Sequence, residues 1–435
     1  MFIRFRFKQG LHIHFFLSLG TWVFLFIHLL FPNRIALGSD AHQTTGQIIS
    51  LEEAIEIAIK NNPQLQSSRY QIDVAEGTLQ QSRLYPNPVI EFLAEEMPTH
   101  DIGLNESQNL VSITQPIITG GKRGLDIRIN EKLKFKNELE RDAVILTVIA
   151  NTKKTFYKAS IDQEGFALSQ KIETIAKGIF ETEKTRFEAG EVPFTNVLRS
   201  ELELSKAKNA VSLSEGRLQN SLKELQTVMG VPDKAITGTT GKVLTKMDKL
   251  SFNELKSYMI KNQPILKASR ENIEIAESEL LLEKRRVIPD MYVSAGYKRL
   301  SQEDTDTVEF GLGIPVPFFN RNQGNIQKGK ALTHKAKSDN LSVYNELLFE
   351  LKKNFTTYNV ERQRIIEFRE NILPKAEKTL NLITIGYKEG EFSYIDLLDA
   401  QRTWSATRVS YIESLRKLNV TVADIERLAV MKIGK

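Results

Sequence analysis

The sequence predicts a mainly α-helical chain with a small β part, built from two copies of one unit. Two stretches 200 residues apart are similar: RFEAGEVPFTNVLRSELELSKAKNAV (186–211) and GYKEGEFSYIDLLDAQRTWSATRVSY (386–411). Residues 122–188 form a long helical stretch without proline. Four short runs, bounded by Pro, Gly and polar residues, show the partial alternation of strands. A period this long with two copies indicates an internal duplication rather than a solenoid of short repeats.

The excess of positive charge lies at the start of the chain. The net charge is +5 over 435 residues, but the first 38 residues hold four basic residues and no acid, which leaves 55 bases against 54 acids in the remainder. A nucleic-acid-binding surface needs a basic excess, so the sequence argues against a nucleic-acid partner.

Residues 1–38 have the order of a signal peptide. A basic opening, MFIRFRFK, precedes the apolar run Phe15–Phe31, and the small residues 36–39 suit cleavage near Gly38. The alternative is an uncleaved inner-membrane anchor, since 17 apolar residues are borderline for a span. A retained anchor would make the protein a membrane-anchored structural coiled coil. The absence of cysteine is compatible with an exported protein.

The duplication extends over the rest of the chain. SLEEAIEIAIKNNPQLQSSR (50–69) lies over SFNELKSYMIKNQPILKASR (251–270), and QPIITGGKRG (115–124) answers IPVPFFNRNQG (314–324). We therefore expect a first repeat over residues 39–250 and a second over residues 251–435. Each repeat has the same order of helix, two strands and a long helical hairpin.

Local signals place the elements of each repeat. Proline suits the first turn of a helix, which predicts helices over 63–84 and 264–285. Strands are expected over 89–96, 110–117, 291–300 and 308–316. Long helices follow over 122–188 and 323–388, and Pro374 should kink the second. Shorter helices return over 192–230 and 392–430.

The returning helices carry a coiled-coil seam with a period of seven residues. Its large residues are Val197, Leu204, Val211, Leu218 and Leu225 in the first copy, and Leu397, Trp404, Tyr411, Leu418 and Ile425 in the second. Small or hydroxyl residues follow three positions after most of them, at Ser200, Ala207, Ser214 and Ser221, and at Ala400, Thr407, Ser414 and Thr421. This pattern predicts closely packed, nearly parallel helices.

Helix lengths predict how these pieces stack. The long helices reach roughly 100 Å and the returning helices about 57 Å, so one return cannot cover a long helix. We expect a returning helix and a proline-led helix to lie end to end beside each long one. Four strands cannot close a barrel, and an open apolar sheet invites aggregation. Several chains, each contributing four strands, would close one barrel together.

The motifs resemble those of the TolC-like outer membrane efflux proteins over almost all of the mature chain. They are LEEAIEIAIKNNPQL, YPNP at 85–88, QPIITGGKR and the two glycine-containing tips. The resemblance implies a homotrimer with a twelve-stranded β-barrel in outer-membrane lipid and an α-helical periplasmic tunnel. It also implies a passive exit duct that docks to a periplasmic adaptor and an inner-membrane proton-driven pump.

The substrate is indicated less directly. YPNP, GGKR and IPVPFFNRNQG are similar to the branch that serves cobalt, zinc and cadmium efflux, so the resemblance implies heavy-metal cations. Export of drugs or secreted polypeptides stays open, because pumps choose substrates. The mature histidines are scattered, at His42, His100 and His334, so we expect no bound metal. We expect no cofactor, and the absence of a nucleophile elbow argues against a hydrolase.

The hairpin tips are the candidate docking site for the adaptor. Gly190 and Gly390 stand where the chain reverses, since glycine adopts a positive φ at little cost. The apolar candidates beside them are Val197, Leu198, Leu397 and Leu398. The alternative is a purely structural turn.

The second tip also holds the candidate gate. Asp396 and Asp399 stand where the first copy has asparagine and arginine, and a narrow ring of aspartates would concentrate cations. The resemblance implies that this hairpin faces the end of the tunnel, and that Tyr387 occupies the position of a gating tyrosine. The alternative is that the acids favour a helix N-terminus. Phe392 replaces a gating arginine of some relatives, which leaves the closing mechanism open.

Overall fold

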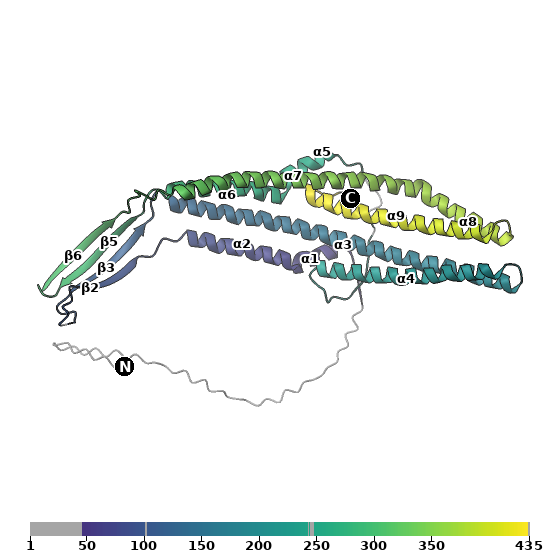
Figure 1. The fold of residues 1–435 in the computed structure, drawn as a ribbon, viewed down its shortest axis with the longest axis horizontal. Coiled ribbons are helices and arrows are strands. Elements are labelled where there is room, and N and C mark those ends of the chain that lie inside the picture. The colour runs from purple at the N-terminus through teal and green to yellow at the C-terminus, as the bar shows by residue number, and fades with distance from the viewer. Residues whose placement is uncertain (1–45, 101, 242, 244–247, 434–435) are drawn as a thin grey trace, which may run out of the picture. The chain divides into compact units, whose positions relative to one another are not determined.

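The structure, a computed structural model, describes residues 46–100, 102–241, 243 and 248–433. The predicted signal peptide, residues 1–38, lies outside the described residues. From residue 46 onward, the same series of helices and strands occurs twice (Figure 1). Among the described residues, none of the helices combines the length and hydropathy that a bilayer-crossing segment needs.

The two copies match element by element. The first contains α1 (Leu51–Asn61), α2 (Pro63–Ser82), β2 (Val89–Glu95), β3 (Gln108–Ile117), α3 (Lys122–Glu188) and α4 (Phe194–Val228). The second contains α5 (Phe252–Asn262), α6 (Pro264–Arg285), β5 (Met291–Leu300), β6 (Thr305–Gly313), α7 (Gln323–Glu367), a π-helical turn η1 (Phe368–Ile372), α8 (Leu373–Glu389) and α9 (Tyr394–Ala429). Two short strands, β1 (Gln47–Ile49) and β4 (Ile236–Thr239), pair in parallel.

Each repeat opens with a helix that the sequence analysis did not predict. Ser50 and Glu53 form a capping box at the start of α1. Asn62 then ends α1 and caps α2, because its side-chain oxygen accepts a hydrogen bond from the backbone N–H of Gln64 at 2.9 Å. Pro63 follows at the first position of α2, as predicted, and α6 likewise begins at Pro264.

The four longer strands form an antiparallel sheet in the order β2-β3-β5-β6. The central pair, β3 and β5, joins the two repeats, and β2 and β6 are the edges. Strand β6 begins three residues before the predicted 308 and ends at Gly313 rather than at 316. Pro315 and Pro317 follow it, and proline lacks the N–H that a ladder needs.

The register gives the sheet two chemically different faces. One row across all four strands is apolar and exposed: Phe92, Val111, Tyr297 and Val308. The next row of the same face reads Ile90, Ile113, Ala295 and Phe310. The row between them, on the opposite face, is Glu91, Ser112, Gly296 and Glu309. Across these three central rows, one face of the sheet is therefore apolar and the opposite face polar.

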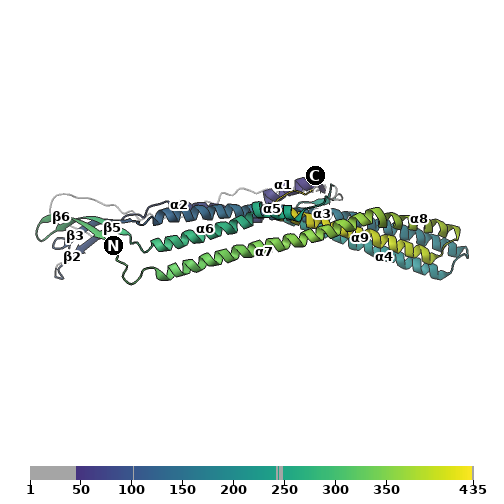
Figure 2. The same cartoon turned by 90° about the horizontal axis from the view of Figure 1, so that it is seen from above.

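The helices pack as their lengths predict. Helices α2 and α4 both contact α3, while α6 contacts α7 and α9 contacts both α7 and α8 (Figures 1 and 2). Two short helices thus lie end to end beside each long one. Within each repeat the strands connect to the long helix at one end, and the hairpin turn lies at the other. Across the repeats, α3 contacts both α6 and α9.

The predicted seam lies inside the packed helices. Of its large residues, Val197, Leu204 and Leu225 are buried in α4, and Leu397, Trp404, Leu418 and Ile425 are buried in α9. Small partners such as Ser200, Ala207 and Ser221 are also buried. Close approach of the helices explains why these positions carry small side chains.

The second long helix is interrupted where the kink was predicted. Helices α7, η1 and α8 have 45, 5 and 17 residues, which together equal the 67 residues of α3. Pro374 lies in the first turn of α8, directly after the π-helical turn. Because proline lacks an N–H and its ring crowds the preceding turn, the wider π-helical turn makes room for it.

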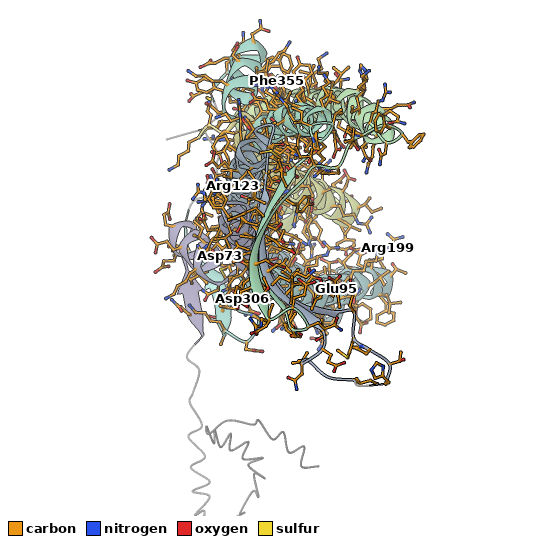
Figure 3. All side chains as sticks on the ribbon, turned by 90° about the vertical axis from the view of Figure 1, so that its left-hand side faces the viewer. Asp73, Glu95, Arg123, Arg199, Asp306 and Phe355 are labelled. Carbon is orange, nitrogen blue, oxygen red and sulfur yellow. The ribbon has the colours of Figure 1, made fainter. Side chains whose placement is uncertain are left out.

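In the first repeat, a cation–π contact and an ion pair stabilise the junction between the strands and the long helix. The Arg123 guanidinium carbon lies 4.0 Å from the ring centroid of Tyr85, and Lys122 forms an ion pair with Asp290 at 2.7 Å. Figure 3 views the molecule from the strand end and labels Arg123. The GGKRG motif is therefore a strand-to-helix turn whose cations contact the chain itself.

Candidate gate and docking site at the hairpin tips

The two hairpin turns have the same backbone geometry. Gly190 and Gly390 have φ angles of +77° and +83°. In each turn the N–H of the next glutamate donates to a carbonyl five residues earlier, at 2.8 and 2.7 Å. A Cβ added at either glycine would meet no atom of the described residues within 4 Å. Backbone conformation rather than crowding therefore explains glycine at both positions.

A polar contact joins the two hairpins just above the turns. Glu183 of α3 is 0% exposed and accepts a hydrogen bond from the Tyr387 hydroxyl of α8. Its other oxygen accepts one from Asn196 Nδ2 at 3.1 Å. The Arg186 guanidinium carbon lies 5.0 Å from the Tyr387 ring centroid. Tyr387, predicted as a latch, is thus tied to a carboxylate of the first hairpin.

The surroundings keep the Tyr387 hydroxyl protonated. Burial raises the pKa of Tyr387, and its hydrogen bond to Glu183 raises that pKa further. The ring centroid of Tyr394 lies 6.4 Å away, and burial raises the pKa of Tyr394 to about 12. The Tyr394 hydroxyl is buried without a hydrogen-bond partner among the described residues.

Asp396 completes the capping box of helix α9, whose N-cap residue is Ser393. Its Oδ2 accepts hydrogen bonds from the backbone N–H and hydroxyl of Ser393, at 2.9 and 2.6 Å, and the Ser393 hydroxyl accepts one from the Asp396 N–H. These hydrogen bonds from Ser393 lower the pKa of the exposed Asp396 carboxyl. This capping box directly supports the structural alternative for Asp396. The matching position in the first copy is Pro193, which cannot form such a cap.

Asp399 lines a groove of about 380 Å³ between α8 and α9. The rest of the lining is mostly apolar or small: Ile372, Lys375, Ala376, Thr379, Ile383, Ala400, Thr403 and Thr407. Asp399 is exposed and lies one turn beyond Asp396. The two aspartates therefore occupy different settings, a helix cap and a groove.

Burial corrects the predicted docking residues. Val197 and Leu397 are 7% and 3% exposed, because they belong to the seam that holds each hairpin together. Leu398 is half-buried and packs against the cluster that joins the hairpins. Leu198 is the exposed member of the four, at 50%. Val197 and Leu397 cannot offer their side chains to a partner without unpacking the hairpins.

Sequence reasoning missed Glu183, which accepts the hydrogen bond of the Tyr387 hydroxyl. A signal for it exists in the spacing: Leu168, Ile172, Ile175 and Ile179 form an apolar stripe on α3, and Glu183 continues that stripe four residues later. An acid on a buried stripe needs a partner. Among the described residues, no group of three or more His, Cys, Asp or Glu could hold a metal ion.

The two-faced sheet, the duplicated hairpins and the hydrogen bond between their tips fit an outer-membrane channel protein. The sequence profile described as "Outer membrane efflux protein" matches residues 54–231 and 255–429, so the chain belongs to this family. It is an outer-membrane efflux channel that extends into the periplasm.

Individual relatives agree with this assignment. The chain is 26% identical to the cobalt-zinc-cadmium resistance protein CzcC of Cupriavidus metallidurans, over 95% of this chain and 98% of that protein. It is 23% identical to the nickel-cobalt-cadmium resistance protein NccC of Alcaligenes xylosoxydans, over 57% and 56% of the two chains. The solved structure of CusC superposes with a TM-score of 0.75 at 14% identity, covering 88% of this chain and 92% of that chain.

These findings confirm the predicted family and fold class. The chain is mainly helical and internally duplicated, with four longer strands, and it has the fold of the trimeric TolC-like channels.

Proposed function

We propose that the protein is the passive exit duct of a tripartite efflux system, assembled from three copies of the chain. One observation carries this proposal: the apolar face of the sheet is exposed, and the outer edges of β2 and β6 have no strand partner among the described residues. Transmembrane barrels have this alternation of apolar outside and polar inside. Three copies would supply twelve strands and close every edge.

The proposed partners are a periplasmic adaptor and an inner-membrane proton-driven pump. We assign adaptor docking to the turns at Gly190 and Gly390, where the backbone is exposed and no side chain crowds it. Residues 1–38 would direct export, and residues 39–250 and 251–435 would be the two repeats. A retained leader would instead favour an anchored coiled coil, and N-terminal sequencing of the purified protein separates the two.

Heavy-metal cations are the proposed substrates. The similar proteins CzcC and NccC are named for resistance to cobalt, zinc, cadmium and nickel, and this favours metal cations over drugs or polypeptides. In the assembled tube, Asp396 and Asp399 would form acidic rings near the tunnel end, and Tyr387 would hold that end closed. Phe392 stands where some relatives carry a gating arginine, so the Tyr387–Glu183 hydrogen bond is the polar contact on which closure would depend.

Growth assays of a deletion strain test the proposal. Deletion should sensitise the host to Co²⁺, Zn²⁺ and Cd²⁺ but leave its tolerance of lipophilic drugs unchanged. Sensitivity to drugs alone would favour the alternative substrate class.

Complementation then tests docking at the turns. Gly190→Trp and Gly390→Trp should give outer-membrane trimers that fail to restore resistance. Gly103→Trp is the matched control, because a Cβ at Gly103 also meets nothing within 4 Å and this residue lies in the loop joining β2 to β3. If all three variants restore resistance equally, docking lies elsewhere.

A further inference from the structure

The groove between α8 and α9 has a covered counterpart in the first repeat. Subtracting 200 from its lining residues gives Ile172, Ile175, Ala176, Ile179, Glu183, Arg199, Ser200, Glu203 and Ala207. These residues lie on α3 and α4. The two grooves are therefore equivalent: each repeat has one, at matching positions of its hairpin.

The second hairpin of the same chain covers the first groove. Ile172, Ile175 and Ile179 pack against the cluster that contains Tyr387 and Tyr394. At the polar positions, Glu183 accepts the Tyr387 hydroxyl hydrogen bond and Glu203 forms an ion pair with Arg402. The first groove is thus filled by side chains that project from α8 and α9.

The first hairpin presents the equivalent side chains to solvent. Phe187, Phe194, Leu198 and Leu202 correspond to Tyr387, Tyr394, Leu398 and Arg402. Their exposed fractions are 40%, 52%, 50% and 55%, whereas those of Tyr387 and Tyr394 are 6% and 5%. The aromatic pair itself is kept, with ring centroids 5.2 Å apart for Phe187 and Phe194. Exposed apolar side chains that gather on one hairpin mark a candidate surface for a partner.

The differences between the copies are complementary. The buried pair of Tyr387 and Glu183 corresponds to Phe187 and Ile383, and the ion pair of Arg402 and Glu203 corresponds to Leu202 and Thr403. In the first pair the hydrogen-bonding groups are absent from both partners, and in the second the charges are absent from both, although Thr403 keeps a hydroxyl. Removing both partners of a polar contact is nearly neutral, whereas removing one leaves a buried group unsatisfied.

We propose that Phe187, Phe194, Leu198 and Leu202 of a second copy of this chain fill the groove between α8 and α9. This inference rests on the assembly in the proposed function. Because the contact joins two different surfaces, it repeats head to tail, and a rotation of one third of a turn per copy closes it into the proposed three-membered ring. The tip then has two kinds of junction: a polar one within each chain, held by Tyr387 and Glu183, and a mostly apolar one between chains, whose groove also carries the exposed charged residues Lys375 and Asp399. Leu198 belongs to the neighbouring chain's groove rather than to the adaptor.

Cysteine crosslinking tests the contact, since the chain contains no cysteine. Phe187→Cys with Ile383→Cys, and Leu202→Cys with Thr403→Cys, are treated in purified trimers with a short bis-maleimide. Both pairs should give dimer and trimer bands in denaturing gels. Glu183→Cys with Tyr387→Cys should react within one chain and keep the monomer mobility. Phe187→Cys with Val409→Cys is the matched negative control, because Val409 is 49% exposed on α9 but does not line the groove.

Assembly is measured separately, by native mass in detergent. Trimers in which neither groove pair links chains would overturn the contact and leave the proposed function standing. Absence of trimers would overturn both. Cells that also carry the adaptor supply the remaining comparison: crosslinks from Phe187→Cys to the adaptor instead of to a second copy would assign the groove to the adaptor and overturn the inference.

Discussion

At the scale of single residues, Tyr387 and Tyr394 provide a natural comparison. Both are buried in the same cluster, but the Tyr387 hydroxyl donates to Glu183, whereas the Tyr394 hydroxyl has no partner among the described residues. Tyr387→Phe removes the hydroxyl that donates a hydrogen bond to the buried Glu183 carboxylate. Losing this donor should lower the folding stability by about 1–3 kcal/mol per chain. We expect a lower melting temperature of the trimer and more frequent openings in planar bilayers.

Tyr394→Phe is the control for that experiment, because it removes an equivalent hydroxyl that has no hydrogen-bond partner in the part of the chain that the structure describes. Its melting temperature and open probability should stay near those of the unaltered protein. Equal effects of the two substitutions would mean that ring packing rather than the Glu183 hydrogen bond holds the tip together.

Asp396 requires a substitution that separates its charge from its cap. Asp396→Asn keeps a side-chain oxygen at the helix start but removes the negative charge, whereas Asp396→Ala removes both. We expect Asn to lower cation selectivity in bilayers with little loss of stability, and Ala to lower both. Unchanged selectivity in either variant would leave Asp396 as a helix cap alone.

The same residue makes a prediction about pH. Its folded pKa lies below its ordinary value, so its cap contributes stability above the unfolded pKa and loses that contribution as pH falls through the folded pKa. The selectivity that depends on Asp396 should therefore persist into the acid range, below the pH at which an ordinary aspartate is half protonated, about 3.9. Reversal potentials measured from pH 7 downward, for this protein and Asp396→Asn, test this.

Residue roles were predictable where a local rule applied. Gly190 and Gly390 were assigned from chain reversal, and both have positive φ. The partner of Tyr387 was not predicted, because Glu183 lies 204 residues away and no local pattern joins them. Val197 and Leu397 were assigned to docking, although their positions in the coiled-coil seam already predicted burial. The two assignments are incompatible, because a buried side chain is not available to a partner.

At the scale of elements, prediction succeeded where boundaries carry strong chemistry. The predicted bounds of α3 match the observed Lys122–Glu188, because glycines precede it and no proline interrupts it. Helices α1 and α5 were missed: each has 11 residues, too short for a decisive period, and α5 lacks a side-chain cap. The β1–β4 pair was missed because three or four residues cannot establish alternation.

At the hairpins, two substitutions can recreate the Tyr387–Glu183 hydrogen bond between two copies of the chain. Ile383→Glu should place a carboxylate in the groove against Phe187 of the next copy, where it has no donor, and should weaken the trimer. Adding Phe187→Tyr recreates the Tyr387–Glu183 pair at the new junction and should restore much of the loss. A double-mutant cycle on trimer melting measures the coupling. Additive effects would mean that the two side chains do not meet.

At the scale of the whole molecule, the faces of the sheet decide where the protein can reside. The row Ile90, Ile113, Ala295 and Phe310 is apolar, and Phe310 is 83% exposed. The neighbouring residue Glu309 lies on the opposite face, 3.9 Å from Lys298. One strand therefore offers two adjacent positions with opposite predicted surroundings, lipid for Phe310 and the water-filled interior for Glu309.

Arginine at these two positions tests the assembly as a whole. On the lipid face it costs about 2–4 kcal/mol near the bilayer midplane, whereas on the interior face it stays in water. Three chains close one barrel in the proposed assembly, so the cost of Phe310→Arg is paid three times in each trimer. We expect Phe310→Arg to deplete trimers from the outer-membrane fraction and Glu309→Arg to assemble normally. Equal recovery of the two variants, measured by heat-modified mobility of membrane fractions, would mean that this face of the sheet does not contact lipid.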